Sequence, residues 1–340
     1  MEFYRERFVN YLDEGDPVTI AGFTWPNSEV FKTMAENDYE AHFVDWVADR
    51  KNDSLERACA FLEEYEVLPR FKLLQERHRN GQVIPFVGAG MSVPSGYRLW
   101  GDFILSLMAD LPNRRADVEE LLEAGRYEEA AQYVHDALTA DNFAEECHNQ
   151  LGEHLKTTRG AVCLFPDIFP NEVVTTNFDY VLNHVYEGSD APFDKEFVGA
   201  RLGQAGQQLG NHPHSLIRLH GEGETATNRV LTTQEYQALY GNGGNFHHAL
   251  ERIIGARSFL FMGCSLMTDR TLEALCRIKQ AAGADATRHY AFLPYPGDDA
   301  REARRAFLGQ AEIHPIYYPP DDHDPYIEDL LICLMEGPFE

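Results

Sequence analysis

The chain has 340 residues, of which 55 are acidic and 29 are basic, so its formal net charge is −26. This balance repels nucleic-acid backbones and anionic membrane surfaces, so we expect no direct nucleic-acid binding and no membrane partner. Backbone amides can still hold a small anionic ligand locally. The first residues are charged where a signal peptide is apolar, and no run reaches the length of a membrane span, so we expect a cytoplasmic protein.

Residues 1–80 are predicted to form a mostly helical extension. Apolar side chains recur at helical spacing over 39–47 and again over 54–68. The short stretch 16–22 is compatible with a strand. The turn-prone segment 77–81 then leads into the first clear strand of the chain.

The most informative segment is an apolar strand at 83–87 that breaks into Gly88-Ala89-Gly90, with Ser92 two residues further on. Glycines let the backbone turn sharply and approach a pyrophosphate, and a helix that follows offers free N–H groups and a positive dipole end. Taken alone, the same residues also make an ordinary tight turn. A helix is expected at 99–111, and a helical block at 114–158 separates this strand from the next one, as a cap inserted over a site would.

From residue 170 onward, apolar strands alternate with helical segments, which favours an α/β fold with a Rossmann-like parallel sheet. We therefore expect residues 81–340 to form one domain that carries the helical insertion. The glycine-rich segment 241–245 is expected to be a turn or a loop. The expected strands cover 172–175, 215–219, 258–262, 288–293 and 312–318.

Three of these strands end, like the first one, in polar or small residues. They are followed by Thr176-Asn177-Phe178-Asp179, by His220-Gly221 and by Gly263-Cys264-Ser265. In an open parallel sheet, residues beyond the carboxyl ends of the strands face a common crevice in which ligands bind. Each segment also has a structural explanation, because Asn and Asp commonly cap helices, a histidine before glycine is as often structural, and 263–265 can begin a helix. Their conjunction predicts a shared nucleotide site.

The four segments, in this order, resemble the hallmarks of the sirtuin-like family: a Gly-Ala-Gly-x-Ser turn, then Asn-x-Asp, His-Gly and Gly-x-Ser. The resemblance covers residues 83 to about 320, and its last strands are similar to a prokaryotic branch associated with antiphage defence. It implies that NAD is bound as the substrate, and that Asn177 and His220 act on the bond between nicotinamide and ribose. It also implies a binding set: Gly88, Ala89, Gly90 and Ser92 at the pyrophosphate, Gly263, Cys264 and Ser265 at the adenosine side, and Thr176, Asp179 and Trp100 around the ribose. An aromatic residue such as Trp100 at the start of an amphipathic helix is more often a core residue.

The sequence departs from protein-deacylating sirtuins in two places. Its six cysteines contain no C-x-x-C pair, so the zinc module of those enzymes is missing, and we expect neither zinc nor disulfides. Where those enzymes carry Pro-Asp-Phe-Arg, this chain has Tyr97-Arg98-Leu99-Trp100 after Gly96. Deacylation is therefore disfavoured. The expected activity is hydrolysis of NAD to nicotinamide and ADP-ribose, and the alternative is a nucleotide-binding sensor or assembly subunit without turnover.

An enzyme that hydrolyses NAD continuously would poison its host, so its activity must be restrained. The resemblance implies an abortive-infection effector controlled by self-assembly into a homo-oligomer or by a partner protein. Sirtuin-like subunits of this branch are commonly paired with a HerA-type ATPase, which is therefore the expected partner. The extension at 1–80 and the insertion at 114–158 are the expected contact segments; the alternative is that both only complete the core.

Overall fold

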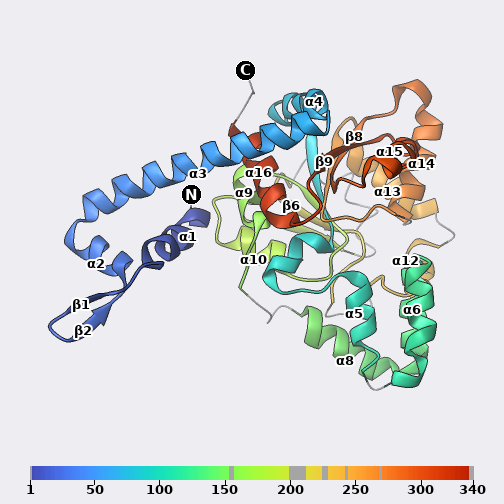
Figure 1. The fold of residues 1–340 in the computed structure, drawn as a ribbon. Coiled ribbons are helices and arrows are strands. Elements are labelled where there is room, and N and C mark those ends of the chain that lie inside the picture. Colours follow the sequence, from blue (N-terminus) through green and yellow to red (C-terminus); the bar gives the residue numbers. More distant parts are fainter. Residues whose placement is uncertain are drawn as a thin grey trace.

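The computed structural model describes residues 2–109, 111–152, 157–198, 212–223, 229–241, 244–267 and 270–336. Among these residues, the centre of the molecule is a sheet of seven parallel strands in the order β5-β6-β4-β3-β7-β8-β9. Helices surround the sheet, and most strand residues are buried, as expected for parallel strands (Figure 1). This confirms the predicted α/β fold with a Rossmann-like sheet. The strands are β3 (Val83–Val87), β4 (Val173–Thr175), β5 (Lys195–Val198), β6 (Ser215–Arg218), β7 (Ser258–Met262), β8 (His289–Pro294) and β9 (Ile313–Tyr318).

The strand order reverses beside β3. From β3 the chain reaches β4 and then β6, with β5 outside them, whereas β7, β8 and β9 follow one another on the other side of β3. Open sheets of this kind bind ligands beyond the carboxyl ends of the strands where the order reverses. That point lies between β3 and β7, which are paired from Val83 and Ser258 to Val87 and Met262.

Each strand expected after residue 170 is present within one residue of its expected bounds, as β4, β6, β7, β8 and β9. Strand β5 was not expected, because it begins with Lys195 and Glu196 and lacks an apolar run. It pairs with β6 at the edge of the sheet, where only Phe197 and Val198 are buried. A half-buried edge strand needs no continuous apolar pattern.

The chain between β3 and β4 is helical. Helix α5 packs on α6 and α7, and α7 also packs on α6, on α8 and on α12 (Thr233–Tyr240), at the lower right of Figure 1. The segment after the glycine turn is a 3₁₀ helix, not the expected start of an α-helix. It contains Pro94 and ends at Gly96, which has a φ of 86°. The elements are η1 (Ala89–Ser95), α5 (Trp100–Ser106), η2 (Pro112–Arg114), α6 (Arg115–Glu123), α7 (Tyr127–Ala137), α8 (Ala140–Leu151), η3 (Ala161–Leu164) and α9 (Phe165–Ile168).

The remaining helices connect and flank the later strands. They are α10 (Val181–Glu187), α13 (Gly244–Ile254), α14 (Arg270–Ala282), η6 (Gly283–Asp285), α15 (Asp298–Gly309) and α16 (His323–Glu336). Of the loop expected at 241–245, residues 242 and 243 lie outside the described residues, and α13 already begins at Gly244. No helix in the described part of the chain combines the length and the apolar character needed to cross a bilayer.

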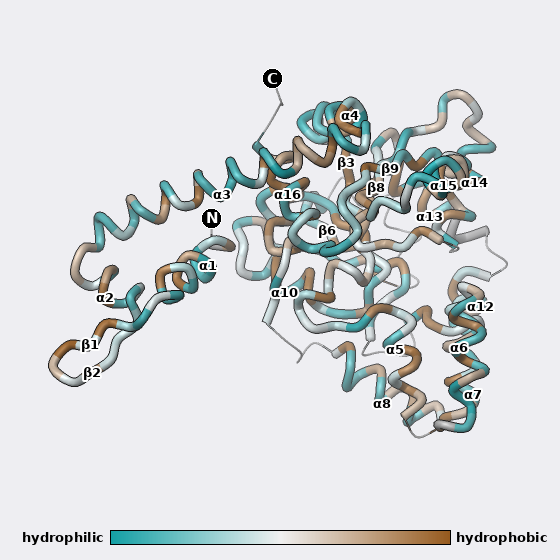
Figure 2. The backbone as a smooth tube through the Cα atoms, in the orientation of Figure 1, coloured by the Kyte–Doolittle hydropathy of each residue, from teal (hydrophilic) through white to brown (hydrophobic). Residues whose placement is uncertain are grey.

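The N-terminal extension consists of α1 (Glu2–Asp13), the antiparallel hairpin β1 (Val18–Ile20) and β2 (Phe23–Trp25), α2 (Asn27–Met34), α3 (Glu36–Glu64) and α4 (Leu68–Arg79). The two apolar repeats expected at 39–47 and 54–68 are mostly one continuous helix, α3, along which apolar and polar stretches alternate in Figure 2. Its first half packs against α1 and α2, and its second half against α16 and β9. The N-terminal half of the extension therefore projects from the body, to the left in Figure 1.

Candidate functional site

Two glycine turns meet at the reversal point of the sheet. The N–H of Gly88 donates to the carbonyl of Met262 at 2.9 Å, and the N–H of Gly90 donates to the carbonyl of Gly263 at the same distance. A Cβ on Gly88 would lie 2.5 Å from the Gly263 oxygen and 2.6 Å from the sulfur of Cys264. Gly263 itself has a φ of +67°, which side-chain-bearing residues rarely adopt. The contact between the two turns therefore requires glycine on both sides.

Asn177 lies just beyond β4 and connects this strand to the first glycine turn. Its Nδ2 donates to the carbonyl of Gly88 and to the Oγ of Ser92, each at 3.1 Å, and its own N–H donates to the Oγ1 of Thr175. Its Oδ1 is buried and has no hydrogen-bond partner among the described residues. A buried acceptor without a donor costs about 1–3 kcal/mol, so this oxygen is suited to receive a donor from a ligand.

Asp179 and Arg218 hold the loop that carries Asn177. The Asp179 carboxylate accepts hydrogen bonds from the N–H of Val181 and from Ser92, and burial raises its pKa above the usual range. Arg218, fully buried at the end of β6, donates to the carbonyls of Asn177 at 3.2 Å and Asp179 at 2.9 Å. Sequence reasoning missed Arg218, although an arginine inside the apolar run that precedes His220 was a signal.

His220 follows β6 by two residues and is half-buried beside aromatic rings. Its ring centroid lies 6.2 Å from that of Trp100 and 6.4 Å from that of Phe178. The Nδ1 atom is buried and unpartnered within the described part of the chain. Burial, with a smaller contribution from the charge of Arg270, lowers the pKa of His220 to about 4. The imidazole is therefore neutral at pH 7 and able to accept a proton.

A cavity of about 610 Å³ lies over the two turns. Of the residues predicted from the sequence, those that line it are Gly88, Ala89, Trp100, Thr176, His220, Gly263, Cys264 and Ser265. Gly90, Ser92, Asn177 and Asp179 are not among its lining residues. The last three form the hydrogen-bonded layer behind it, and Asn177 reaches the cavity wall through the carbonyl of Gly88. The structure thus brings the four strand ends together and divides them into a lining and a supporting layer.

The helical insertion supplies the opposite wall, through residues 124–129 at the junction of α6 and α7. Glu128 forms a two-pronged ion pair at 2.8 Å with Arg270, which also lines the cavity at the start of α14. The guanidinium of Arg270 lies 3.8 Å from the ring centre of Tyr236 on α12. This contact between insertion and body was not predicted, because an ion pair between residues 142 positions apart leaves no local pattern.

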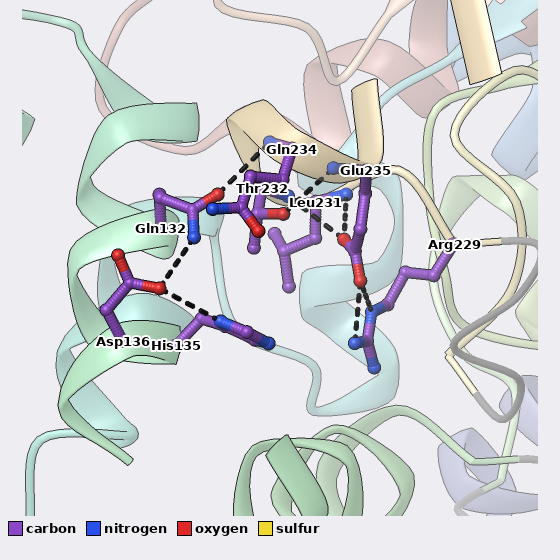
Figure 3. A network of polar contacts seen from close by, with 8 residues as sticks. All are labelled: Gln132, His135, Asp136, Arg229, Leu231, Thr232, Gln234 and Glu235. Atoms are coloured by element: carbon purple, nitrogen blue, oxygen red, sulfur yellow. Dashed lines mark hydrogen bonds and ion pairs between the residues drawn. The ribbon is translucent and has the colours of Figure 1, made fainter. Parts of the chain in front are cut away.

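The loop before α12 completes the wall and is tied to the insertion by a polar network (Figure 3). Glu235 accepts from the guanidinium of Arg229 and from the N–H groups of Leu231 and Thr232, forming a capping box with the Thr232 side chain. Across from it, Gln132 on α7 accepts from the N–H of Gln234 at 3.1 Å. The network connects the loop that carries the cavity-lining Leu231 to α7.

Comparison with known proteins finds similarity to one domain family and to two curated proteins. Residues 171–316 match the SIR2-like domain family, a match that begins after the first glycine turn. The chain is also similar to two curated proteins named NAD(+) hydrolase ThsA. It is 23% identical over 220 residues to the one from Acinetobacter baumannii, covering 64% of this chain and 43% of that protein. It is 25% identical over 238 residues to the one from Cytobacillus dafuensis, covering 69% of this chain and 45% of that protein. The matches thus span less than half the length of either relative.

The cysteines and other potential metal ligands are dispersed. All six cysteines are free thiols. Within the described ranges, no group of three or more His, Cys, Asp or Glu side chains is placed to hold a metal ion. The polar side chains that line the cavity carry an imidazole, carboxylates, guanidinium groups, hydroxyls and the thiol of Cys264.

Proposed function

We propose that this protein hydrolyses NAD+ at the bond between nicotinamide and ribose, yielding nicotinamide and ADP-ribose, and that it acts in antiphage defence. The observation that carries the proposal is the pair of unpartnered polar atoms, Asn177 Oδ1 and His220 Nδ1, at adjacent strand ends around a cavity at the reversal point of the sheet. A volume of about 610 Å³ falls in the range of small-molecule sites. The similarity to NAD(+) hydrolases supports the choice of substrate.

The chemistry follows from the neutral state of His220. The C1′–N1 bond of NAD+ breaks and its electron pair leaves with nicotinamide, so the ribose carbon passes through an oxocarbenium-like state. A water oxygen then bonds to C1′, and His220 takes up one water proton as the general base. We assign to Asn177 Oδ1 the task of orienting that water or a ribose hydroxyl, after a small displacement of the Gly88 turn.

The remaining predicted residues receive binding roles in this proposal. The turn at 88–90, with Ser92 behind it, brings its backbone close to the pyrophosphate, and 263–265 contacts the adenosine side. Because the N–H groups of Gly88 and Gly90 already donate to the second turn, we assign the pyrophosphate contact to the N–H of Ala89. Thr176 and Trp100 line the ribose end of the cavity. Asp179 supports the site from behind, because its carboxylate is already bonded to Ser92 and to the backbone at Val181.

The proposal is tested by incubating the purified protein with NAD+ and separating the products by chromatography. We expect nicotinamide and ADP-ribose, and loss of turnover by about 10²–10⁴-fold in His220→Ala, the usual worth of a positioned base. Asn177→Ala should lose activity as well. His184→Ala, on α10 outside the cavity lining, is the matched control and should retain activity. NAD+ left intact under every condition, including with a HerA-type ATPase added, would contradict the proposal.

We further propose that activity is restrained in the uninfected cell and acts on the cytoplasmic NAD+ pool. The candidates for control are self-assembly and a partner ATPase of the HerA type. The insertion at 114–158 forms part of the cavity wall, so a partner that moves it would change access to the site.

A further inference from the structure

The hairpin β1–β2 at the end of the extension exposes an unusual amount of apolar surface. Every residue of both strands is exposed, including Ile20 (49%), Phe23 (69%) and Trp25 (42%). Figure 2 shows an apolar stretch at this tip, which is remote from the sheet. A lone two-stranded hairpin is marginally stable in water, and an exposed edge strand readily pairs with other chains. We call residues 13–29, which include this hairpin, the arm tip.

All charged side chains of the arm tip are acidic. Between Phe8 and Phe31 the chain has four carboxylates, Asp13, Glu14, Asp16 and Glu29, and no lysine or arginine. A surface that covers the arm tip must therefore combine positive charge with some apolar area. Because the protein as a whole carries a net charge of −26, few of its own surfaces can meet this requirement.

This chain itself has a surface that fits. We call Arg70, Arg288, Arg301 and Arg305 the basic patch. Arg301 and Arg305 lie one turn apart on α15, and Arg301 bonds the backbone just before α4. Arg70, in the first turn of α4, contacts β9, which pairs with β8, the strand that Arg288 precedes. Burial and the charges of the other three lower the pKa of Arg70. Arg70 donates to the carbonyl of Pro315, a bond that leaves its charge unbalanced.

Two further contacts define the surroundings of the basic patch. Arg301 donates to the carbonyl of Tyr65 and contacts the carboxylate of Glu66, which is 79% exposed. Leu73, three residues after Arg70 and on the same side of α4, is a large apolar side chain with 43% exposure. Arginines that repel one another beside exposed apolar surface form a site for an acidic, apolar segment.

The arm tip and the basic patch lie at opposite ends of α3. Phe8 on α1 packs against Tyr39 near the start of α3, whereas Arg301 bonds the carbonyl of Tyr65, the residue that ends it. A helix of 29 residues is about 43 Å long, so the tip of one chain is held away from the basic patch of the same chain. In Figure 1 the hairpin β1–β2 is at the far left, whereas α4 and α15 lie beyond the other end of α3.

We propose that the arm tip of one copy docks on the basic patch of a second copy, head to tail. The carboxylates of the arm tip meet the arginines, and Phe23 and Trp25 cover the apolar surface beside them. Such a heterologous contact leaves one free tip and one free patch in each dimer, so it continues into a closed ring or an open filament. The inference concerns assembly and stands independently of NAD+ hydrolysis.

The test uses two variants of the full chain, Phe23→Asp in the arm tip and Arg288→Glu with Arg305→Glu in the basic patch. Wild-type protein should form oligomers that dissociate as salt rises, and each variant alone should be monomeric by light scattering. A one-to-one mixture of the variants should give a dimer and nothing larger, because one intact tip and one intact patch remain. Arg252→Glu with Arg277→Glu, two exposed positions on α13 and α14, is the control of equal charge change, and should assemble normally.

Three results would overturn the proposal. One is a monomeric wild type at every concentration. Another is a basic-patch variant that still assembles while the arm variant does not, which indicates contact between two tips. The third is a wild type that stays monomeric but binds a DNA duplex through the arginines. Formation of the mixed dimer also shows that both variants are folded, so loss of assembly in each alone cannot be attributed to unfolding.

Discussion

Gly263→Ala is the most direct test of the contact between the two glycine turns. A Cβ at this position would lie 2.5 Å from the N of Met91 and 2.9 Å from the carbonyl oxygen of Gly88, both backbone atoms that cannot rotate away. The left-handed backbone costs alanine about 1–2 kcal/mol. Overpacking adds about 1–3 kcal/mol, so we expect a loss of about 2–5 kcal/mol in the free energy of unfolding. Gly283→Ala is the matched control, because its φ of +61° is similar and no atom lies within 4 Å of its Cβ.

The assay is urea denaturation at equilibrium, followed by a thermal melt. We expect the control to lose only the backbone cost, about 1–2 kcal/mol. With an unfolding entropy of about 2.1 cal/mol/K per residue, a loss of 3 kcal/mol lowers the melting temperature of a chain this size by about 4 °C. NAD+ cleavage should fall in Gly263→Ala and persist in the control. Equal losses of stability in the two variants would refute the close approach of the turns.

Three further predictions concern buried charge. The pKa of about 4 for His220 predicts that kcat/KM for NAD+ stays near its plateau down to about pH 5. A histidine with an unperturbed pKa near 6.5 would already be about 90% protonated at pH 5.5. Arg270→Gln removes a positive charge near His220, so it should move the acid limb of the pH profile to higher pH. Arg218→Lys should lower both kcat and the urea midpoint. Nη1 of Arg218 donates to both backbone carbonyls and Nη2 donates to Asn183 Oδ1, and a single ammonium cannot cover both positions, so an acceptor left unpaired costs about 1–3 kcal/mol. Burial lowers the pKa of His289 to about 3, and its Nδ1 accepts the N–H of Phe259, so the unfolded chain takes up the proton first. Stability should then fall as the pH drops from about 6.5 toward 3, by about 1.4 kcal/mol per unit, and His289→Gln should flatten this slope in urea titrations.

The sheet could be predicted from the sequence because parallel strands buried on both faces are continuous apolar runs. Strand β7 is an example, since Ser258–Met262 is wholly buried and follows the pattern residue by residue. Strand β5 was missed for the converse reason, since Lys195 and Glu196 are only partly buried at an edge. The 3₁₀ segment after the glycine turn was also missed, because the effect of Pro94 on a short helix depends on its context.

The strand-end residues of the site could also be predicted from the sequence, because the carboxyl ends of parallel strands share one edge of the sheet. Their division into a cavity lining and a supporting layer could not be predicted, because it depends on which way each side chain points. Asn177 turns back toward Gly88, whereas His220 faces the cavity. Arg218 and Arg270 were overlooked because the contacts that give them importance join elements far apart in the sequence.

The glycine turns, although they are the most visible signal in the sequence, are the weakest argument for function. Packing accounts for them, since Gly88 and Gly263 leave no room for a Cβ in each other's presence. The two unpartnered atoms are a stronger argument, because packing does not account for them. Neither Asn177 Oδ1 nor His220 Nδ1 has a hydrogen-bond partner among the described residues. A buried polar atom without a partner costs about 1–3 kcal/mol unless a ligand supplies the missing hydrogen bond. The functional argument therefore depends on these two atoms, and the glycine turns provide the support that holds Asn177 in place.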